Sequence, residues 1–166
     1  MKGLAALTSR ASDEWQTPPE LLERMKRYLG IEGFDLDAAA TAENTVAPRF
    51  YSREDDALCN EWPQTGWAWC NPPFSRVSEF ARKARRSVQN SGYLRVCMLV
   101  PARTDTAWWH EELFPFASEI WFVRGRVGFL HPSHRGRTRS PFPTVILLLD
   151  GDRGTPRLTA RSLALP

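Results

Sequence analysis

The sequence predicts a single α/β domain built on a mostly parallel β-sheet. Apolar runs of strand length alternate with segments of helical periodicity, which is typical of a parallel sheet covered by helices on both faces. The last two predicted strands follow each other with no helix between them, so we expect that pair to be antiparallel. With 166 residues and 42% hydrophobic content, the chain has the size of one domain and can bury a core.

Composition divides the chain into three parts. We expect a flexible N-terminus at residues 1–12, the folded domain at residues 13–150, and a C-terminal tail at residues 151–166, which begins with a polar, glycine-containing stretch. There is no internal repeat and no low-complexity block.

The first helix is predicted to begin at Thr17 and to run to about Leu29. Thr17 is suited to cap it, Pro18 to take its first position, and Glu20 to reach back as a capping box. Gly30 then ends it. Its buried face is predicted from residues that recur at helical spacing: Leu21, Leu22, Met25 and Leu29.

Further elements follow from the same patterns. Strands are predicted at residues 34–37, 66–70, 94–100, 119–123 and 144–149, and helices at residues 76–89 and 105–113. Ser75 is suited to cap the first of these helices. We expect the arginines on its outer face, such as Arg82 and Arg85, to face solvent. Residues 41–54 carry no regular pattern.

The stretch Asn71-Pro72-Pro73-Phe74 directly follows an uncharged apolar strand. Two consecutive prolines cannot continue a strand because each lacks an N–H, so the strand ends abruptly here. Its end presents an amide side chain, backbone carbonyls and an aromatic ring. These groups suit a planar ligand that carries an amine, and a chance double-proline turn is the structural alternative.

A second candidate strand end lies at residues 34–40, where apolar and acidic residues give way to three alanines. In parallel sheets, ligands bind at the carboxyl ends of strands near a topological switch. Asp35, Asp37, Ala38 and Ala39 are therefore candidates for cofactor contacts, although an ordinary strand end explains them as well. The short spacing from Asp37 to Asp56 predicts a sheet that is trimmed on this side.

The groups at Asn71 can assist chemistry on a nucleobase amine. The Asn71 side-chain oxygen and the Pro72 carbonyl are acceptors for the two N–H bonds of such an amine, and Phe74 can stack on the ring. Holding both hydrogens favours the pyramidal amine that develops as a bond forms at nitrogen. The sequence therefore predicts group transfer to an amine.

S-adenosylmethionine fits as the second ligand because its sulfonium charge activates a methyl group and its other groups need acidic partners. Asp35 or Asp37 would accept from the ribose hydroxyls or the amino group. Asp56 would accept from the cofactor's adenine amine while Leu58 covers the ring, and an exposed acidic loop explains Asp56 equally well.

Charge favours a nucleic-acid partner without requiring one. The net charge is +3 and the sequence pI is near 9.0. Residues 124–139 hold five arginines and no acid, and arginines on such a loop can bind the phosphates of double-stranded DNA. The five are Arg124, Arg126, Arg135, Arg137 and Arg139. A basic hairpin without a ligand is the alternative.

A base inside a duplex would have to be flipped out to reach Asn71.

Other features bear on location and metals. Three widely spaced cysteines are typical of reduced thiols in a cytoplasm. No apolar run is long enough for a signal-peptide core or a membrane span, so we expect a cytoplasmic protein, with a monomer favoured. The histidines lack the spacing of metal ligands, so no metal site is expected.

Several motifs together resemble the phage-type DNA N6-adenine methyltransferase family, over about residues 15–150. They are Trp15–Pro18, Phe34–Ala40, Asn44, Asp56–Leu58, Trp62, Asn71–Phe74, Leu99–Arg103 and Gly125–Phe129. The resemblance implies a Rossmann-like enzyme that uses S-adenosylmethionine to methylate adenine N6 in DNA inside a bacterial host. It also implies that Asn71–Phe74 is the catalytic motif.

By the same resemblance, Asp56 contacts the cofactor's adenine and Asp37 is a cofactor contact, as is the segment Trp15, Gln16, Thr17 and Pro18. A helix cap accounts for Thr17 and Pro18 equally well. The enzyme alternatives are methylation of RNA, a free base or a protein glutamine. A catalytically silent nucleic-acid-binding module of the same fold is the alternative outside enzymes.

Overall fold

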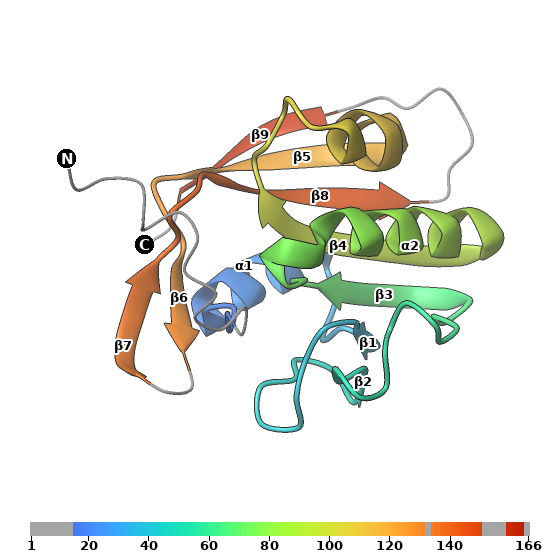
Figure 1. The fold of residues 1–166 in the computed structure, drawn as a ribbon, viewed down its shortest axis with the longest axis horizontal. Helices are drawn as coiled ribbons and strands as arrows, with labels where there is room; N and C mark the ends of the chain where they lie inside the picture. The colour runs from blue at the N-terminus through green and yellow to red at the C-terminus, as the bar shows by residue number, and fades with distance from the viewer. Residues whose placement is uncertain (1–14, 132–133, 151–158, 165–166) are drawn as a thin grey trace.

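The computed structural model describes residues 15–131, 134–150 and 159–164. Its central sheet has seven strands in the order β2-β1-β3-β4-β8-β5-β9 (Figure 1). They are β1 (Leu36–Asp37), β2 (Arg49–Phe50), β3 (Thr65–Cys70), β4 (Tyr93–Pro101), β5 (Ala117–Arg124), β8 (Thr144–Asp150) and β9 (Thr159–Ala164). Neighbouring strands are parallel except where β8 lies antiparallel to β4 and to β5. The predicted antiparallel pairing of the last two strands is confirmed.

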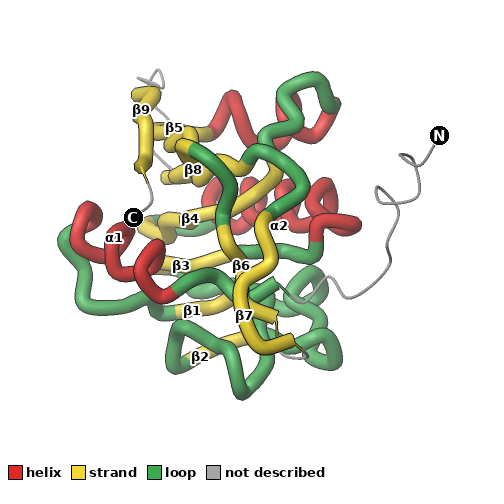
Figure 2. Tube along the Cα trace, turned by 90° about the vertical axis from the view of Figure 1, so that its left-hand side faces the viewer, coloured by secondary structure: helices red, strands yellow, loops and turns green. Residues whose placement is uncertain are grey.

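Two α-helices cover opposite faces of this sheet (Figure 2). One buried cluster joins α1 (Pro19–Leu29) to the sheet, and a second joins α2 (Val77–Asn90) to the other face. Because both faces are covered, residues 96–100 of β4 form a continuous apolar run and are fully buried. Fully burying one large apolar side chain contributes about 1.5–3 kcal/mol, so this central strand anchors the domain.

The ends of α1 differ in how well the sequence predicted them. Gly30 ends the helix in the left-handed conformation, with φ of 68°, as expected. The helix begins at Pro19 with Pro18 as its N-cap, so the prediction that Thr17 caps it is wrong. Glu20 pairs with Arg137 instead of forming a capping box. The side chain of Thr17 is therefore available for a contact outside the helix.

The start of α2 is also different from the prediction. A short 3₁₀ helix, η2 (Phe74–Arg76), follows the prolines, and Arg76 is the N-cap of α2, so Ser75 does not cap it. The outer arginines of α2 are not simply solvated, because Arg82 and Arg85 contact the buried Glu112 at 3.0 and 2.7 Å. Burial raises the pKa of Glu112, but the two guanidinium groups more than offset this and hold it below its usual value.

Three regions carry elements that the sequence did not predict. The irregular stretch contains β2, and the third helix is a π-helix, η3 (Trp109–Leu113), followed by a 3₁₀ helix, η4 (Phe114–Phe116). The assignment of a tail is wrong for residues 159–164, which form β9 and pair with β5. Only Leu163 of β9 is buried, so no apolar alternation marked the strand. Residues 1–14 and 151–158 lie outside the described part of the chain.

A β-hairpin stands at one end of the sheet. It consists of β6 (Gly128–His131) and β7 (His134–Arg139), and the arrowheads of β3 and β4 point toward it (Figure 1). It contacts the segment before α1 through an antiparallel bridge between Gln16 and Leu130. The hairpin therefore lies at the carboxyl ends of the parallel strands.

The chain order creates a topological switch between β1 and β3. These strands are parallel neighbours, but the chain leaves β1 toward β2 on one side and leaves β3 toward β4 on the other. In open parallel sheets, ligands bind outside the carboxyl ends at such a point. Asn71 follows β3 and Ala38 follows β1, so both candidate strand ends lie at the switch.

Candidate active site

The side chain of Asn71 is held by the segment that precedes α1. Its amide nitrogen Nδ2 donates to the backbone oxygen of Trp15 at 2.6 Å and to the hydroxyl of Thr17 at 3.2 Å. A backbone oxygen can only accept, so the Trp15 contact identifies the nitrogen end of the amide. The other end, Oδ1, is buried and has no hydrogen-bond partner among the described residues.

This unsatisfied oxygen distinguishes Asn71 from an ordinary structural asparagine. Leaving a buried acceptor without a donor costs about 1–3 kcal/mol, and such atoms are uncommon in folded proteins. The cost is removed when a ligand brings an N–H to the oxygen. One end of the amide is therefore fixed by the protein, and the acceptor at the other end has no partner among the described residues.

Aromatic rings surround the end of β3. Phe74 packs edge-on against the buried ring of Phe129, with centroids 6.0 Å apart, and Trp15 packs on Phe129 at 5.7 Å. Edge-to-face packing restricts the plane of a ring, so Phe74 has a defined orientation beside Asn71. Pro72 is buried and the Pro73 carbonyl accepts from the amide of Arg76 at 2.9 Å, which fixes the turn after the strand.

Asp37, at the end of β1, is engaged in a different way. Its carboxyl group accepts from the backbone amides of Ala39 at 3.3 Å and Val46 at 3.1 Å, and only 3% of the residue is exposed. Burial raises its pKa to about 6, although the two backbone hydrogen bonds lower it. Ala38 donates to the carbonyl of Trp69 in β3 at 2.9 Å. Asp37 thus holds the loop that follows β1.

The alanine turn needs no glycine. Among the described residues, the only non-glycine residue with positive φ is Asp56, so Ala38 and Ala39 keep ordinary backbone conformations. Ala38 is fully buried and Ala39 is partly buried against the core on the α2 side. Alanines therefore make this turn without backbone strain.

The structure separates Asp35 from the other candidates. Its carboxylate accepts from the Trp67 amide at 2.8 Å and lies against Gly66, where an added Cβ would stand 2.3 Å from the carboxylate oxygen. Trp67 precedes Asn71 by four strand residues, or about 13 Å at 3.3 Å per residue. Asp35 therefore closes the start of β3 rather than its end.

Asp56 and Leu58 lie near the start of α2. The Asp56 carboxylate accepts from the thiol of Cys59 at 3.3 Å and from the amide of Leu58 at 3.2 Å, and these bonds lower its pKa. The positive charge of Arg76, just after Phe74, also lowers it. Leu58 packs against the same core cluster as Phe74. This loop is therefore brought toward the end of β3.

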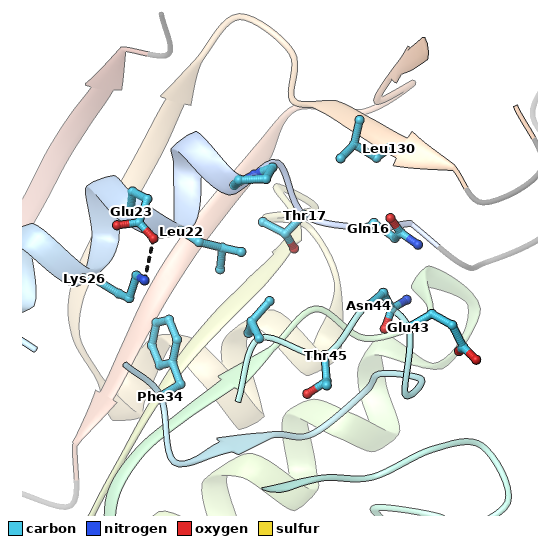
Figure 3. A pocket seen from close by; sticks show the side chains of 12 residues that line it. Gln16, Thr17, Leu22, Glu23, Lys26, Phe34, Glu43, Asn44, Thr45 and Leu130 are labelled. Carbon is cyan, nitrogen blue, oxygen red and sulfur yellow. Dashed lines mark ion pairs between the residues drawn. The ribbon is translucent and has the colours of Figure 1, made fainter. Parts of the chain in front are cut away.

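A cavity of about 350 Å³ opens beside Thr17 (Figure 3). Gln16 and Thr17 lie on one side of it and the loop carrying Asn44 and Thr45 on the other, while Leu22 and Phe34 form an apolar wall. The lining is completed by Pro19, Glu23, Lys26, Glu43, Val46 and Leu130. Ligand pockets have volumes of about 300–1,000 Å³, so the cavity is at the small end of that range.

The predicted DNA-binding arginines differ in their surroundings. Arg124, Arg126 and Arg139 are exposed. Arg137 forms an ion pair with Glu20 of α1, which raises the pKa of Arg137 and lowers that of Glu20. The side chain of Arg135 lies outside the described part of the structure, although its backbone belongs to β7.

The described residues contain neither a cluster of metal ligands nor a membrane-spanning helix. None of their His, Cys, Asp and Glu side chains form a group of three that would hold a metal ion. None of the helices in this part of the chain is long and apolar enough to cross a bilayer.

Three features of the site were not predicted from the sequence. The first is the contact between the Trp15 carbonyl and Asn71, and the second is the packing of Phe129 on Phe74. The third is the presence of Glu43 and Thr45 in the cavity lining. The motif at residues 125–129 and the polar stretch after β1 indicated the regions but not the contacts, which join residues far apart in the chain.

The fold and site together define an α/β protein with a candidate ligand site at the carboxyl ends of two neighbouring parallel strands. Its family is shown by comparison. A family model described as DNA N-6-adenine-methyltransferase (Dam) matches residues 5–163, and the chain belongs to this family.

A curated relative supports the same assignment. The DNA N-6-adenine-methyltransferase of Escherichia phage T1 is 38% identical over 109 residues, which cover 66% of this chain and 44% of the relative. The chain thus matches less than half the length of that phage protein.

Proposed function

We propose that this protein transfers a methyl group from S-adenosylmethionine to the N6 amine of adenine in DNA. The observation that carries the proposal is the buried Oδ1 of Asn71, which lacks a donor among the described residues and lies at the switch between β1 and β3. An exocyclic amine supplies the N–H that this oxygen needs. Membership of the family and the name of the phage T1 relative support DNA adenine as the substrate.

Asn71 would act by accepting one N–H bond of the target amine, and the Pro72 carbonyl by accepting the other. These contacts strengthen as the amine becomes pyramidal and positively charged, so they stabilise the transition state more than the ground state. Phe74 would stack on the base. No general base is required, because the proton leaves after the amine has become cationic.

Base entry requires a local movement. The Oδ1 atom is inaccessible to solvent in the described conformation, so a neighbouring group has to shift before a base can reach it. Phe74 is partly exposed and follows Asn71 closely in the chain, which makes its ring the candidate for that shift. The base itself would be flipped out of the duplex.

The residues present fit S-adenosylmethionine as cofactor. When bound, it supplies an activated methyl group. The polar side chains of Gln16 and Asn44 line the cavity beside Thr17, which itself contacts Asn71. Asp56 and Leu58 offer an acceptor and an apolar cover for an adenine ring. Asp37 would act through the loop that it holds, because its carboxylate already accepts two backbone N–H groups.

We also propose that the sheet is a trimmed form of the Rossmann-like methyltransferase fold. Its support is the switch between β1 and β3, the single antiparallel strand β8, and the connection from β1 to β2, which contains no helix. The family description supports action on DNA, and the source of the relative, Escherichia phage T1, supports a bacterial host cell as the place of that action.

The segment from Arg124 to Arg139, which contains the hairpin, is the proposed DNA-binding element. It carries exposed arginines, and its hairpin lies at the carboxyl ends of the strands (Figure 2). Arg126→Gln combined with Arg139→Gln should lower the slope of log affinity against log salt by about 0.9 for each phosphate that is no longer neutralised. Arg86→Gln, an exposed change on α2, serves as the matched control. An unchanged slope in the double variant, with a reduced slope for Arg86→Gln, would move the DNA-binding surface to α2.

The activity is tested with S-adenosylmethionine that carries a labelled methyl group and with unmethylated duplex DNA. Digestion of the DNA to nucleosides should give labelled N6-methyldeoxyadenosine. RNA and a glutamine-containing peptide are supplied in parallel reactions. Label that appears only in RNA, in the peptide or on cytosine would contradict the proposed function.

A further inference from the structure

The amide of Asn71 is fixed by two acceptors that come from more than fifty residues earlier in the chain. We propose that the Trp15 carbonyl and the Thr17 hydroxyl are positioning groups, which hold this amide in one orientation and require an amide rather than a carboxylate at position 71. The contacts are Nδ2 to the Trp15 oxygen at 2.6 Å and Nδ2 to the Thr17 hydroxyl at 3.2 Å. The catalytic consequence rests on the proposed function, whereas the orientation itself does not.

Two contacts are needed because an asparagine amide has no strong orientation of its own. The terminal torsion of asparagine is broad and roughly two-fold, so an unrestrained amide exchanges its oxygen and nitrogen easily. Reversing the amide of Asn71 would place Oδ1 at 2.6 Å from the Trp15 oxygen with no hydrogen between them. The described orientation is therefore strongly preferred, and it directs Oδ1 away from Trp15 and Thr17.

The two acceptors are themselves held in place. Gln16, between them, exchanges backbone hydrogen bonds of 2.9 and 3.0 Å with Leu130 of β6, and the ring of Trp15 packs on Phe129 of the same strand. Pro18, which follows, is buried. A preorganised acceptor orients its donor without the entropy loss of ordering a flexible segment. This gives Thr17 a role that a helix cap does not explain.

The Trp15 carbonyl also selects against a carboxylate. An ionised aspartate at position 71 would set a negative oxygen against that carbonyl, whereas a protonated one could donate to it as Asn71 does. The pKa of such an aspartate would be raised. Its ionised form would be repelled by the Trp15 carbonyl and would lose the orientation that directs one oxygen at the ligand. Its activity should therefore be lost as pH rises through the raised pKa.

Titratable groups on the neighbouring elements also contribute to the pH dependence of activity. They are Asp37 at the end of β1, Cys70 at the end of β3, Asp56 in the loop before β3 and Arg76 before α2. Asp37 titrates near pH 6 by itself. The wild type contains all four groups. At each pH the kcat of Asn71→Asp is therefore divided by the kcat of the wild type, so that only the titration at position 71 remains.

The first test separates positioning from cofactor binding, because Thr17 also lines the cavity. Thr17→Val should lower kcat about fivefold at saturating cofactor, the effect of one neutral hydrogen bond, and Thr17→Ser should restore most of the loss. Cofactor affinity, measured by calorimetry without DNA, should change less than about twofold. A Thr17→Val protein with unchanged kcat and about tenfold weaker cofactor binding would overturn the proposal while leaving the proposed function intact.

A second readout does not depend on activity. In the NMR spectrum of the wild type, both side-chain N–H protons of Asn71 should show hydrogen-bonded shifts, and one should move to a free value in Thr17→Val. Unperturbed resonances in that variant would contradict the contact even if methylation were never observed.

The third test uses Asn71→Asp. The ratio of its kcat to that of the wild type should fall at least about tenfold between pH 5.5 and pH 8.5, the change expected from one ionisation. A ratio that stays constant over this range would show that position 71 does not require a donor, and it would overturn the proposal.

Discussion

The ends of β1 and β3 lie side by side and each carries a largely buried polar residue, yet the two residues are used in opposite ways. Asp37 accepts from two backbone amides and so holds the loop after β1. Asn71 uses its nitrogen within the protein and leaves Oδ1 without a partner among the described residues. We therefore propose that the end of β1 is supporting structure and that a ligand completes the hydrogen bonding at the end of β3.

Hydrogen bonding distinguishes Asp37 from Asn71, although the two residues hold equivalent positions at the ends of their strands. From the sequence, Asp37 and Asn71 were both expected to contact ligands because both end strands at the same edge of the sheet. Only Asn71 has a buried acceptor without a partner among the described residues. We therefore expect changes at Asn71 to affect turnover and changes at Asp37 to affect stability.

The largest effect is expected for Asn71→Ala, which removes the acceptor for the target amine. Turnover should fall at least about a hundredfold, the scale of losing a preorganised polar contact, with cofactor affinity little changed. The measurements are steady-state methylation and cofactor binding by calorimetry. Asn90→Ala, at the exposed end of α2, is the matched control. A parallel loss of cofactor binding in Asn71→Ala would mean that Asn71 supports the cofactor rather than the base.

The next effect concerns stability and pH at Asp37. Its folded pKa of about 6 exceeds the ordinary value of 3.8, so the native state binds more protons than the unfolded state between these values. This group therefore destabilises the fold as pH rises from about 3 to about 7, by about 3 kcal/mol in all, and its effect is constant above that range. Asp37→Asn lacks this titration.

The measurement is urea unfolding of both proteins at several pH values. The stability of Asp37→Asn relative to the wild type should rise by about 2 kcal/mol from pH 4 to pH 6 and level off near pH 7. A difference that does not change with pH would contradict the assignment of Asp37 as a buried, backbone-bound carboxyl group. Cofactor-dependent turnover should follow the fraction folded.

A smaller effect is expected at Phe74. Phe74→Leu should weaken DNA binding or raise the KM for DNA about tenfold, because stacking on a base contributes about 1–3 kcal/mol. Phe74→Tyr keeps a stacking ring and is the control that should retain most of the affinity. Equal losses in the two variants would indicate that the edge contact with Phe129, and not stacking on the base, determines the phenotype.

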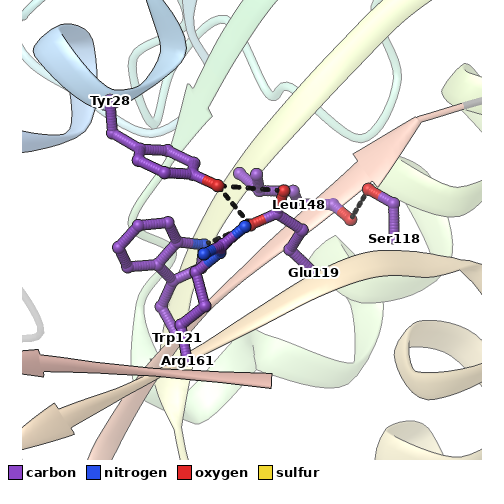
Figure 4. Close-up of polar contacts among 6 residues, drawn as sticks. All are labelled: Tyr28, Ser118, Glu119, Trp121, Leu148 and Arg161. Atoms are coloured by element: carbon purple, nitrogen blue, oxygen red, sulfur yellow. Dashed lines mark hydrogen bonds and ion pairs between the residues drawn. The ribbon is translucent and has the colours of Figure 1, made fainter. Parts of the chain in front are cut away.

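Local patterns predicted the features that depend on neighbours in sequence. The end of α1 at Gly30 and the abrupt end of β3 before Pro72 follow from backbone chemistry alone, and both are observed. Elements without an apolar period were missed, as β9 shows. That strand is held by Arg161, which pairs with Glu119 beside Tyr28 and Trp121 (Figure 4).

The site was predictable in part. The two prolines after Asn71 were sufficient to predict that it lies at a strand end. The contact of Asn71 with Thr17 joins residues 54 positions apart, so sequence spacing cannot predict it. Thr17 looked like a helix cap because Pro follows it, whereas the second proline moves the start of the helix one residue further on. The same limit applies to Glu112, whose arginine partners lie 27 and 30 residues away.

The most direct measurement is a crystal structure of the protein with DNA and a non-reactive analogue of S-adenosylmethionine. The account predicts that the N6 atom of a flipped adenine lies about 2.7–3.2 Å from Oδ1 of Asn71, while Nδ2 still contacts the Trp15 carbonyl. Finding Oδ1 bonded to a protein group, with the adenine amine held elsewhere, would contradict it.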